Sequence, residues 1–244
     1  MRLTRLYTPT PLHVGALAKL TDAGAQHATR VLRLRVGAPL IVFDGQGAEH
    51  RAEIAAIERQ RVTVNVGEPS PAAPESPLSI TLAQGVARAE RMDWALQKAV
   101  ELGVARIAPL LTARSVVRLD DAQAAKRLDH WRNVVIGACE QCGRARLPEM
   151  LAPTTLDRYL AASGRESLRL ALDPTASLSL AALPQTPSSV ELLIGPEGGL
   201  DDVELQRAQA AGFVSVRLGP RVLRTESAAI VALSVLQARW GDLR

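Results

Sequence analysis

A proline-rich segment constrains the fold of this 244-residue chain more than any other feature of its sequence. Residues 67–77 read GEPSPAAPESP, with four prolines and no large apolar side chain. Because proline lacks an N–H group and has a fixed φ, such a segment cannot form a helix or a central strand. We therefore expect a linker, assigned to residues 71–77, between a first module of residues 1–70 and a second module of residues 78–244.

The first module has the pattern of a small β-barrel. An apolar run at Pro39–Asp44 is followed by a glycine-containing turn at residues 45–47. Two further strand patterns follow at Glu49–Ile57 and Arg61–Val66, and the second of these alternates with a period of two. The segment Thr21–Val31 is expected to form the one helix of this module.

Strand and helix patterns alternate in the second module. In its first helical pattern, Met92, Leu96 and Ala99 fall on one face, and Gly103 is expected to end the helix. This alternation predicts an α/β domain around a mostly parallel sheet. Strands are expected at Leu78–Ala87, Ala105–Leu111, Ser167–Leu172, Val190–Ile194 and Phe213–Leu218, and helices at Glu90–Leu102, Asp120–Gln141, Asp201–Ala211 and Glu226–Trp240.

The composition limits the classes of function. Lysine and arginine number 29 against 25 acidic residues, giving a net charge of +4 and a pI near 9.6, which suits a polyanionic partner. Cys139 and Cys142 cannot complete a four-ligand zinc site, so we expect two reduced thiols and no metal. The sequence shows no signal-peptide pattern and no apolar stretch of membrane-spanning length, so we expect a cytoplasmic protein with no membrane partner.

Two glycine-rich segments follow strand patterns in the second module. The first reads LLIGPEGGL at Leu192–Leu200, and the second contains LGPRVLRTESAA at Leu218–Ala229. Ligands bind at the carboxyl ends of strands in open α/β sheets, and glycine lets the backbone approach a ligand closely. Ordinary tight turns and a buried core helix are the alternative readings, and Thr225 or Glu226 could cap that helix. Neither a GxGxxG motif at the first strand nor a phosphate-binding loop is present, which disfavours both nucleotide-site types.

These segments resemble the bacterial 16S rRNA (uracil-1498-N3)-methyltransferase family of the SPOUT superfamily. The resemblance covers nearly the whole chain, because further segments match in order. They are RVLRLRVG at Arg30–Gly37, MDWALQKAVELGV at Met92–Val104, RSVVR at Arg114–Arg118 and CEQCGRARLP at Cys139–Pro148.

The resemblance implies an α/β SPOUT domain with a carboxy-terminal trefoil knot, preceded by a small PUA-like β-barrel. It implies S-adenosylmethionine as cofactor, 16S ribosomal RNA or the 30S subunit as substrate, and a homodimer in which Glu226–Trp240 could take part. Nine of the residues expected to bind the cofactor lie in the glycine-rich segments, and the tenth, Leu172, ends an earlier strand pattern. The nine are Ile194, Gly195, Pro196, Glu197, Gly198, Gly199, Leu218, Gly219 and Leu223.

For methylation of uracil N3, Arg224 is the candidate that stabilises the developing anion. Glu197 and Glu226 are candidates for the base, although Glu226 could simply cap its helix and water could take the proton. The candidate RNA contacts are Arg30, Arg33, Arg35, Arg114, Arg144 and Arg221. Arg33 and Arg35 would face the same side of a strand and could contact phosphates. The alternatives are another SPOUT enzyme, such as a ribose 2′-O-methyltransferase, and a non-catalytic RNA-binding protein of ribosome assembly.

Overall fold

The computed structural model describes residues 3–59, 61–115, 120–162, 167–184 and 186–243. The chain forms two compact units. The first unit comprises Met1–Glu75 and Ile136–Leu147, and the second comprises Ser76–Val135 and Pro148–Arg244. Residues 136–147 therefore pack with the first unit, although they lie beyond the proline-rich segment in the sequence. Among the described residues, no helix combines the length and apolar character needed to cross a membrane.

The first unit is built on a five-stranded sheet with the order β1-β3-β4-β5-β2. The pair β1–β3 is parallel and the other neighbours are antiparallel. As the alternating pattern predicted, Val62, Val64 and Val66 of β5 are all buried, together with Leu40 and Val42 of β3. The elements are β1 (Arg5–Tyr7), β2 (Leu17–Lys19), α1 (Asp22–Gln26), η1 (His27–Val31), β3 (Pro39–Phe43), β4 (Glu49–Glu58) and β5 (Arg61–Pro69).

Two predictions for this unit need correction. Strand β5 runs to Pro69, so the proline-rich segment does begin in a strand, whereas the linker assigned to residues 71–77 lies beyond it. Proline is tolerated there because Pro69 pairs with His50 beside an irregularity in the register of β4 and β5. Arg33 and Arg35 do not lie on a strand, and Arg33 has a left-handed φ of 54°. Both arginines are nevertheless exposed, because Leu34 between them packs against the core.

The second unit contains a parallel sheet with the order β12-β10-β11-β6-β7-β8, and β9 also pairs with β7. The parallel α/β architecture predicted from the alternating pattern is confirmed. The trefoil knot is not established by this strand order and stays a prediction. The strands are β6 (Ser79–Gly85), β7 (Arg106–Leu111), β8 (Glu149–Met150), β9 (Thr154–Thr155), β10 (Leu168–Leu172), β11 (Ser189–Ile194) and β12 (Val214–Val216).

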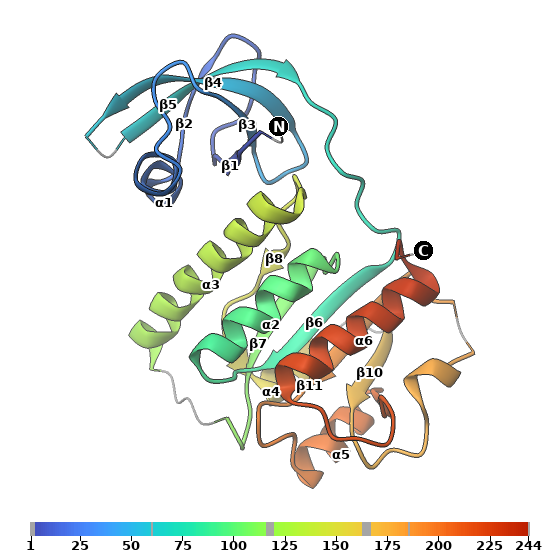
Figure 1. The fold of residues 1–244 in the computed structure, drawn as a ribbon. Helices are drawn as coiled ribbons and strands as arrows, with labels where there is room; N and C mark the ends of the chain where they lie inside the picture. Colours follow the sequence, from blue (N-terminus) through green and yellow to red (C-terminus); the bar gives the residue numbers. More distant parts are fainter. Residues whose placement is uncertain (1–2, 60, 116–119, 163–166, 185, 244) are drawn as a thin grey trace. The chain divides into compact units, whose positions relative to one another are not determined.

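Helices cover the sheet, and α2 and α6 lie side by side (Figure 1). Ala83 and Leu193 pack in one cluster with residues of α4 and α5. Their strand neighbours Leu82 and Leu192 point to the opposite face and are also fully buried, as expected for a parallel sheet covered on both faces. The helices are α2 (Ala89–Glu101), α3 (Asp121–Cys142), α4 (Leu156–Ala162), η2 (Leu180–Ala182), α5 (Asp202–Ala210) and α6 (Thr225–Trp240), and Gly103 follows α2 with a φ of 75°, as expected.

Candidate functional site

A cavity of about 370 Å³ lies in the second unit, where β10, β11 and β12 end. These three strands are neighbours in the sheet, so the segments that follow them meet at one edge. The ten residues predicted to bind a cofactor all line this cavity. The two glycine-rich segments, far apart in the sequence, thus share one pocket.

A third segment of the cavity wall was missed by sequence reasoning. Asp173, Pro174 and Thr175 follow β10 and also line the cavity. The Oδ1 atom of Asp173 accepts hydrogen bonds from the N–H of Thr175 at 2.8 Å and from its hydroxyl at 2.7 Å. This tight turn directly after an apolar strand is the signal that could have identified the segment.

The first glycine-rich loop is folded tightly upon itself. A Cβ atom on Gly195 would lie 2.6 Å from the backbone of Gly199 and of Leu200, so the close approach requires glycine at this position. In the second loop, Gly219 has a φ of 135°, a conformation that residues with a Cβ rarely adopt. Local backbone geometry therefore accounts for glycine in both loops.

Arg114, an expected RNA contact, braces the first loop. Its Nη1 atom donates to the carbonyl of Gly198 at 2.9 Å and to that of Leu200 at 3.4 Å. The side chain also lines the cavity. Residues 116–118 of the RSVVR motif lie outside the described residues.

Glu197 lies on the cavity wall, and one of its two carboxylate oxygens makes polar contacts. Its Oε1 atom accepts a hydrogen bond from the N–H of Arg88 at 2.9 Å and lies 3.5 Å from Nη1 of Arg91. Its Oε2 atom is buried and has no hydrogen-bond partner among the described residues. Glu197 therefore has one oxygen fixed at the start of α2 and one oxygen uncommitted.

The other two catalytic candidates do not line the cavity within the described part of the chain. Arg224 is exposed and is the N-cap residue of α6, next to Leu223 on the wall. Glu226 is buried in the first turn of α6, and its Oε2 atom lacks a partner among the described residues. Arg221, by contrast, is exposed and lines the cavity.

The expected capping of α6 by Thr225 or Glu226 is wrong, because the N-cap residue is Arg224 and makes no side-chain capping bond. The Thr225 hydroxyl instead donates to the carbonyl of Gly195 at 2.6 Å and accepts from Nε2 of Gln84 at 2.8 Å. Thr225 also lines the cavity, whereas Gln84 is a fully buried residue of β6. Sequence reasoning singled out neither side chain as part of this site.

The expected RNA contacts of the first unit divide into two groups. Arg30, Arg33 and Arg35 are exposed. Arg144 is buried and its Nη2 atom lies 2.5 Å from Oε2 of Glu75, so its guanidinium is not presented on the surface as a phosphate contact would require. The adjoining Cys139 is also buried, which raises the pKa of its thiol to about 12 and leaves it inert.

Both units of the chain are similar to known protein families. A family model described as an RNA methyltransferase domain matches residues 74–237, and one described as an RNA methyltransferase PUA domain matches residues 20–67. Ribosomal RNA small subunit methyltransferase E of Buchnera aphidicola subsp. Schizaphis graminum is 32% identical, over 99% of this chain and 98% of the relative. The protein of the same name from Mycobacterium bovis is 35% identical, over 96% of this chain and 92% of the relative.

Two solved structures are also similar to this chain over its full length. Ribosomal RNA small subunit methyltransferase E from Neisseria gonorrhoeae, bound to S-adenosyl methionine, is 38% identical with a TM-score of 0.94 and full coverage of both chains. A protein from Legionella pneumophila, solved in complex with the bound cofactor SAM, is 44% identical with the same TM-score and coverage. Since the RNA methyltransferase domain model covers more than half of the chain and the relatives match across its length, the chain belongs to the ribosomal RNA small subunit methyltransferase E family.

Proposed function

We propose that this protein is an S-adenosylmethionine-dependent methyltransferase of small-subunit ribosomal RNA, and that it methylates N3 of uridine 1498 in 16S RNA. One observation carries the proposal: the residues expected to bind the cofactor line a single cavity at the ends of adjacent strands. The reaction would take place in the cytoplasm, where ribosomal subunits are assembled.

The wall of the cavity suits S-adenosylmethionine. Its volume of about 370 Å³ lies within the range of small-molecule sites. Leu172, Ile194 and Leu223 provide apolar surface for an adenine ring, and the glycine-rich loops bring backbone groups close. Asp173 and Glu197 place carboxylates on the wall, which complement the positive sulfonium and amino groups of this cofactor.

The protein's own contribution to the chemistry is positioning and proton transfer. When bound, S-adenosylmethionine supplies a methyl group that its sulfonium centre has already activated. The uracil must lose its N3 proton, and Glu197 is the candidate base on the cavity wall, through its uncommitted Oε2 atom. Glu226 is the weaker candidate because it is buried outside the wall. Arg224 would donate to a uracil carbonyl oxygen as negative charge develops there.

RNA binding would draw on exposed arginines. Arg30, Arg33 and Arg35 are exposed in the first unit, and Arg221 is exposed at the cavity. Such side chains position a phosphate backbone without reading its sequence. Arg114 is committed to loop carbonyls and would act mainly through the loop. A homodimer is proposed with this function. Helix α6 buries half of its apolar residues within its own chain, and its exposed Val231, together with the exposed Trp94 of α2, offers apolar surface to a second copy.

Two measurements test this function. Calorimetric titration with S-adenosylmethionine should show binding by the wild type and by Gly137→Ala, whose added Cβ meets nothing within 4 Å. The Gly219→Val variant should lose binding because a β-branched residue does not adopt a φ of 135°. Nucleoside analysis of 16S RNA after reaction should show 3-methyluridine. A 2′-O-methyl product would favour the alternative enzyme, and absence of cofactor binding would favour a non-catalytic assembly protein.

A further inference from the structure

A buried amide lies behind the wall of the cavity. Gln84, the residue before the last of β6, is fully buried and is not part of the cavity lining. Its Nε2 atom donates to the hydroxyl of Thr225 at 2.8 Å and to the carbonyl of Gly85 at 3.0 Å, and it lies 3.4 Å from the carbonyl oxygen of Gly195. The side chain of Gln84 thus links the end of β6 to two residues that are distant from it in the sequence, Gly195 and Thr225.

The Thr225 hydroxyl is the middle of this network. It donates to the carbonyl of Gly195 at 2.6 Å. Gly195 begins the first glycine-rich loop, and Thr225 begins α6 directly after the second loop. A single hydroxyl therefore joins the start of one cavity loop to the end of the other.

The direction of each hydrogen bond follows from the number of protons available. A threonine hydroxyl has one proton, and this proton is used on Gly195, so the hydroxyl can only accept from Gln84. The amide of Gln84 must therefore present its nitrogen, which leaves its Oε1 atom buried without a hydrogen-bond partner in the described part of the chain. A buried acceptor without a partner lowers stability, so stability alone would favour an apolar residue here.

The neighbouring residue brings the first loop into direct contact with β6. A Cβ atom on Gly85 would lie 2.5 Å from the backbone nitrogen of Pro196. The loop therefore rests on the end of β6, and Gln84 adds hydrogen bonds at the point of contact.

We infer that Gln84 is a positioning residue that acts through Thr225 to hold the two glycine-rich loops at the separation required by the ligand of the cavity. Gln84 does not touch this ligand, and its effect is transmitted by the carbonyl of Gly195 and the first turn of α6. The inference deepens the proposed function and depends on it for the identity of the ligand, S-adenosylmethionine.

The test compares three variants of the full chain. Thr225→Ser keeps the hydroxyl, Thr225→Val removes it at nearly the same size, and Gln84→Met removes the amide from a side chain of similar length. Ser189→Ala is the matched control, because it removes a side-chain hydrogen bond, to Ser167 at 3.1 Å, at the opposite end of β11 from the cavity. Hydrogen–deuterium exchange of residues 194–200 and 218–224 is measured in the ligand-free protein, together with thermal stability and affinity for S-adenosylmethionine.

We expect amide exchange in both loops to rise about tenfold in Thr225→Val and Gln84→Met, and affinity for S-adenosylmethionine to fall by about the same factor. Thr225→Ser and Ser189→Ala should stay near the wild type in both measurements. Gln84→Met should show little loss of thermal stability, which separates positioning from a general structural role. A double variant that combines Thr225→Val with Gln84→Met should have the same effect as either single variant, because both changes interrupt one chain of hydrogen bonds.

Two results would overturn the inference. One is unchanged loop exchange in both Thr225→Val and Gln84→Met. The other is faster exchange in Thr225→Ser as large as that in Thr225→Val. Failure of the wild type to bind S-adenosylmethionine would instead contradict the proposed function, and the exchange comparison in the free protein would still decide the role of Gln84.

Discussion

The two units bury polar groups of different kinds. The first unit buries charges: Arg5 forms an ion pair with Glu49 in which both side chains are less than 10% exposed, and Arg144 pairs with Glu75. In the second unit, the buried groups that link the two cavity loops are neutral, the amide of Gln84 and the hydroxyl of Thr225, whereas the charged Arg114 that also braces the first loop is exposed. The buried pairs of the first unit thus carry charge, whereas the network of Gln84 and Thr225 in the second unit carries none.

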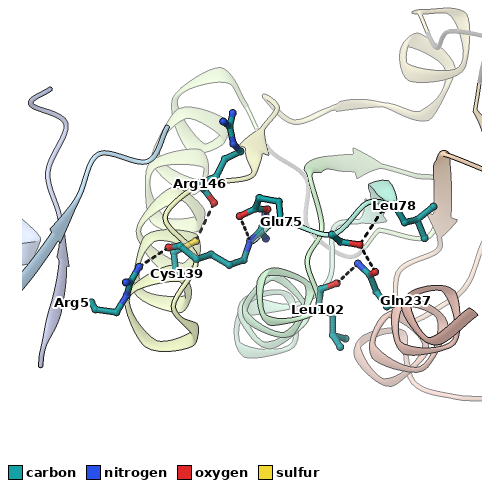
Figure 2. Close-up of polar contacts among 9 residues, drawn as sticks. Arg5, Glu75, Leu78, Leu102, Cys139, Arg146 and Gln237 are labelled. Atoms are coloured by element: carbon teal, nitrogen blue, oxygen red, sulfur yellow. Dashed lines mark hydrogen bonds and ion pairs between the residues drawn. The ribbon is translucent and has the colours of Figure 1, made fainter. Parts of the chain in front are cut away.

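A second neutral network in the second unit follows the same rule. The Ser76 hydroxyl donates to Oε1 of Gln237 at 2.7 Å, and Nε2 of Gln237 donates to the carbonyl of Leu102 at 2.8 Å (Figure 2). Within the described residues, the second unit also buries the ion pair of Arg169 with Glu191, at 3.5 Å. These two residues lie near the starts of β10 and β11, whereas the cavity lies at the ends of the same strands.

Charged and neutral buried networks have different consequences for a protein. A buried ion pair has lost its hydration, so each charge depends on its partner. An amide and a hydroxyl can fix backbone carbonyls without adding charge. Beside a cavity proposed to hold a cationic cofactor, such neutral groups add no charge to that of the ionisable side chains on the wall, which include Asp173 and Glu197 as well as Arg114 and Arg221.

The largest expected effect comes from breaking the Arg5–Glu49 pair. Arg5→Met leaves the Glu49 carboxylate buried and unpaired, which should lower the free energy of unfolding by about 3–5 kcal/mol. The double variant Arg5→Met with Glu49→Leu should recover most of that loss, because no charge remains buried. Urea denaturation of both variants measures the difference. Equal stability of Arg5→Met and the wild type would show that the buried Glu49 carboxylate does not need Arg5 as its partner.

The next effect concerns the chemical step in the second unit. Arg224→Ala and Arg224→Lys should reduce single-turnover methylation by about a hundred- to a thousandfold, or about 2.7–4 kcal/mol, if the guanidinium stabilises the developing anion. Affinity for S-adenosylmethionine and thermal stability should stay near those of the wild type, because Arg224 is exposed and does not line the cavity within the described chain.

Arg221→Ala is the matched control for Arg224, since Arg221 is an exposed arginine three residues earlier that does line the cavity. Its loss should weaken RNA binding more than it slows the chemical step. If the Arg224 variants mainly lose stability or cofactor affinity, and saturating cofactor restores methylation, then Arg224 only braces the loop.

Elements with a strong local pattern could be predicted from the sequence, and those without one could not. The alternation in β5 predicted a strand whose valines share one face, and the glycine-rich motifs contain nine of the ten residues that were predicted to bind the cofactor and that line the cavity. Helix α4 was missed because its seven residues are too few for an apolar stripe to repeat. The segment Asp173–Thr175 was missed because it contains no glycine.

Buried polar residues were the hardest to predict. Gln84 lies in an apolar strand, and two of its hydrogen-bond partners are 111 and 141 residues away in the sequence. No local pattern distinguishes such an amide from an exposed one. Arg144 was expected on the surface for the same reason, because only the folded chain places Glu75 beside it. Local chemistry therefore predicted the loops of the site but not the groups that hold them.

A smaller effect is expected at the exposed charges of the first unit. Reversing Arg33 and Arg35 together to Glu should weaken RNA binding about tenfold or more and reduce the slope of its salt dependence by about two, one for each phosphate contact. Cofactor affinity should not change. The matched control reverses Arg59 and Arg61, two exposed arginines of the same unit, with the same change in charge. Equal losses in both double variants would indicate net charge and not a specific RNA contact.

The smallest effect is expected at Glu140, a partly buried carboxyl group of the first unit. Burial raises the pKa of Glu140, while the N–H of Tyr7, which donates to its Oε1 at 3.0 Å, and the nearby His27 and Arg5 lower it. Because the folded-state pKa is higher than the unfolded one, the folded protein binds this proton more tightly. The carboxyl group therefore favours folding at acidic pH, and this contribution is lost as pH rises through the raised folded-state pKa.

Replacing Glu140 with Gln tests this sign. The Gln side chain keeps an oxygen that can accept from Tyr7 but cannot ionise, so the stability of the variant should change less with pH in the acidic range, and at neutral pH the variant should be at least as stable as the wild type. Urea denaturation across a pH series measures both. The control is Glu149→Gln, since Glu149 is exposed and its pair with Arg106 is at the surface, where ion pairs contribute little. The contrary result is a Glu140→Gln variant that is less stable than the wild type at neutral pH and has an unchanged pH profile. It would show that the ionised Glu140 carboxylate stabilises the first unit, so that this unit compensates its buried charges fully.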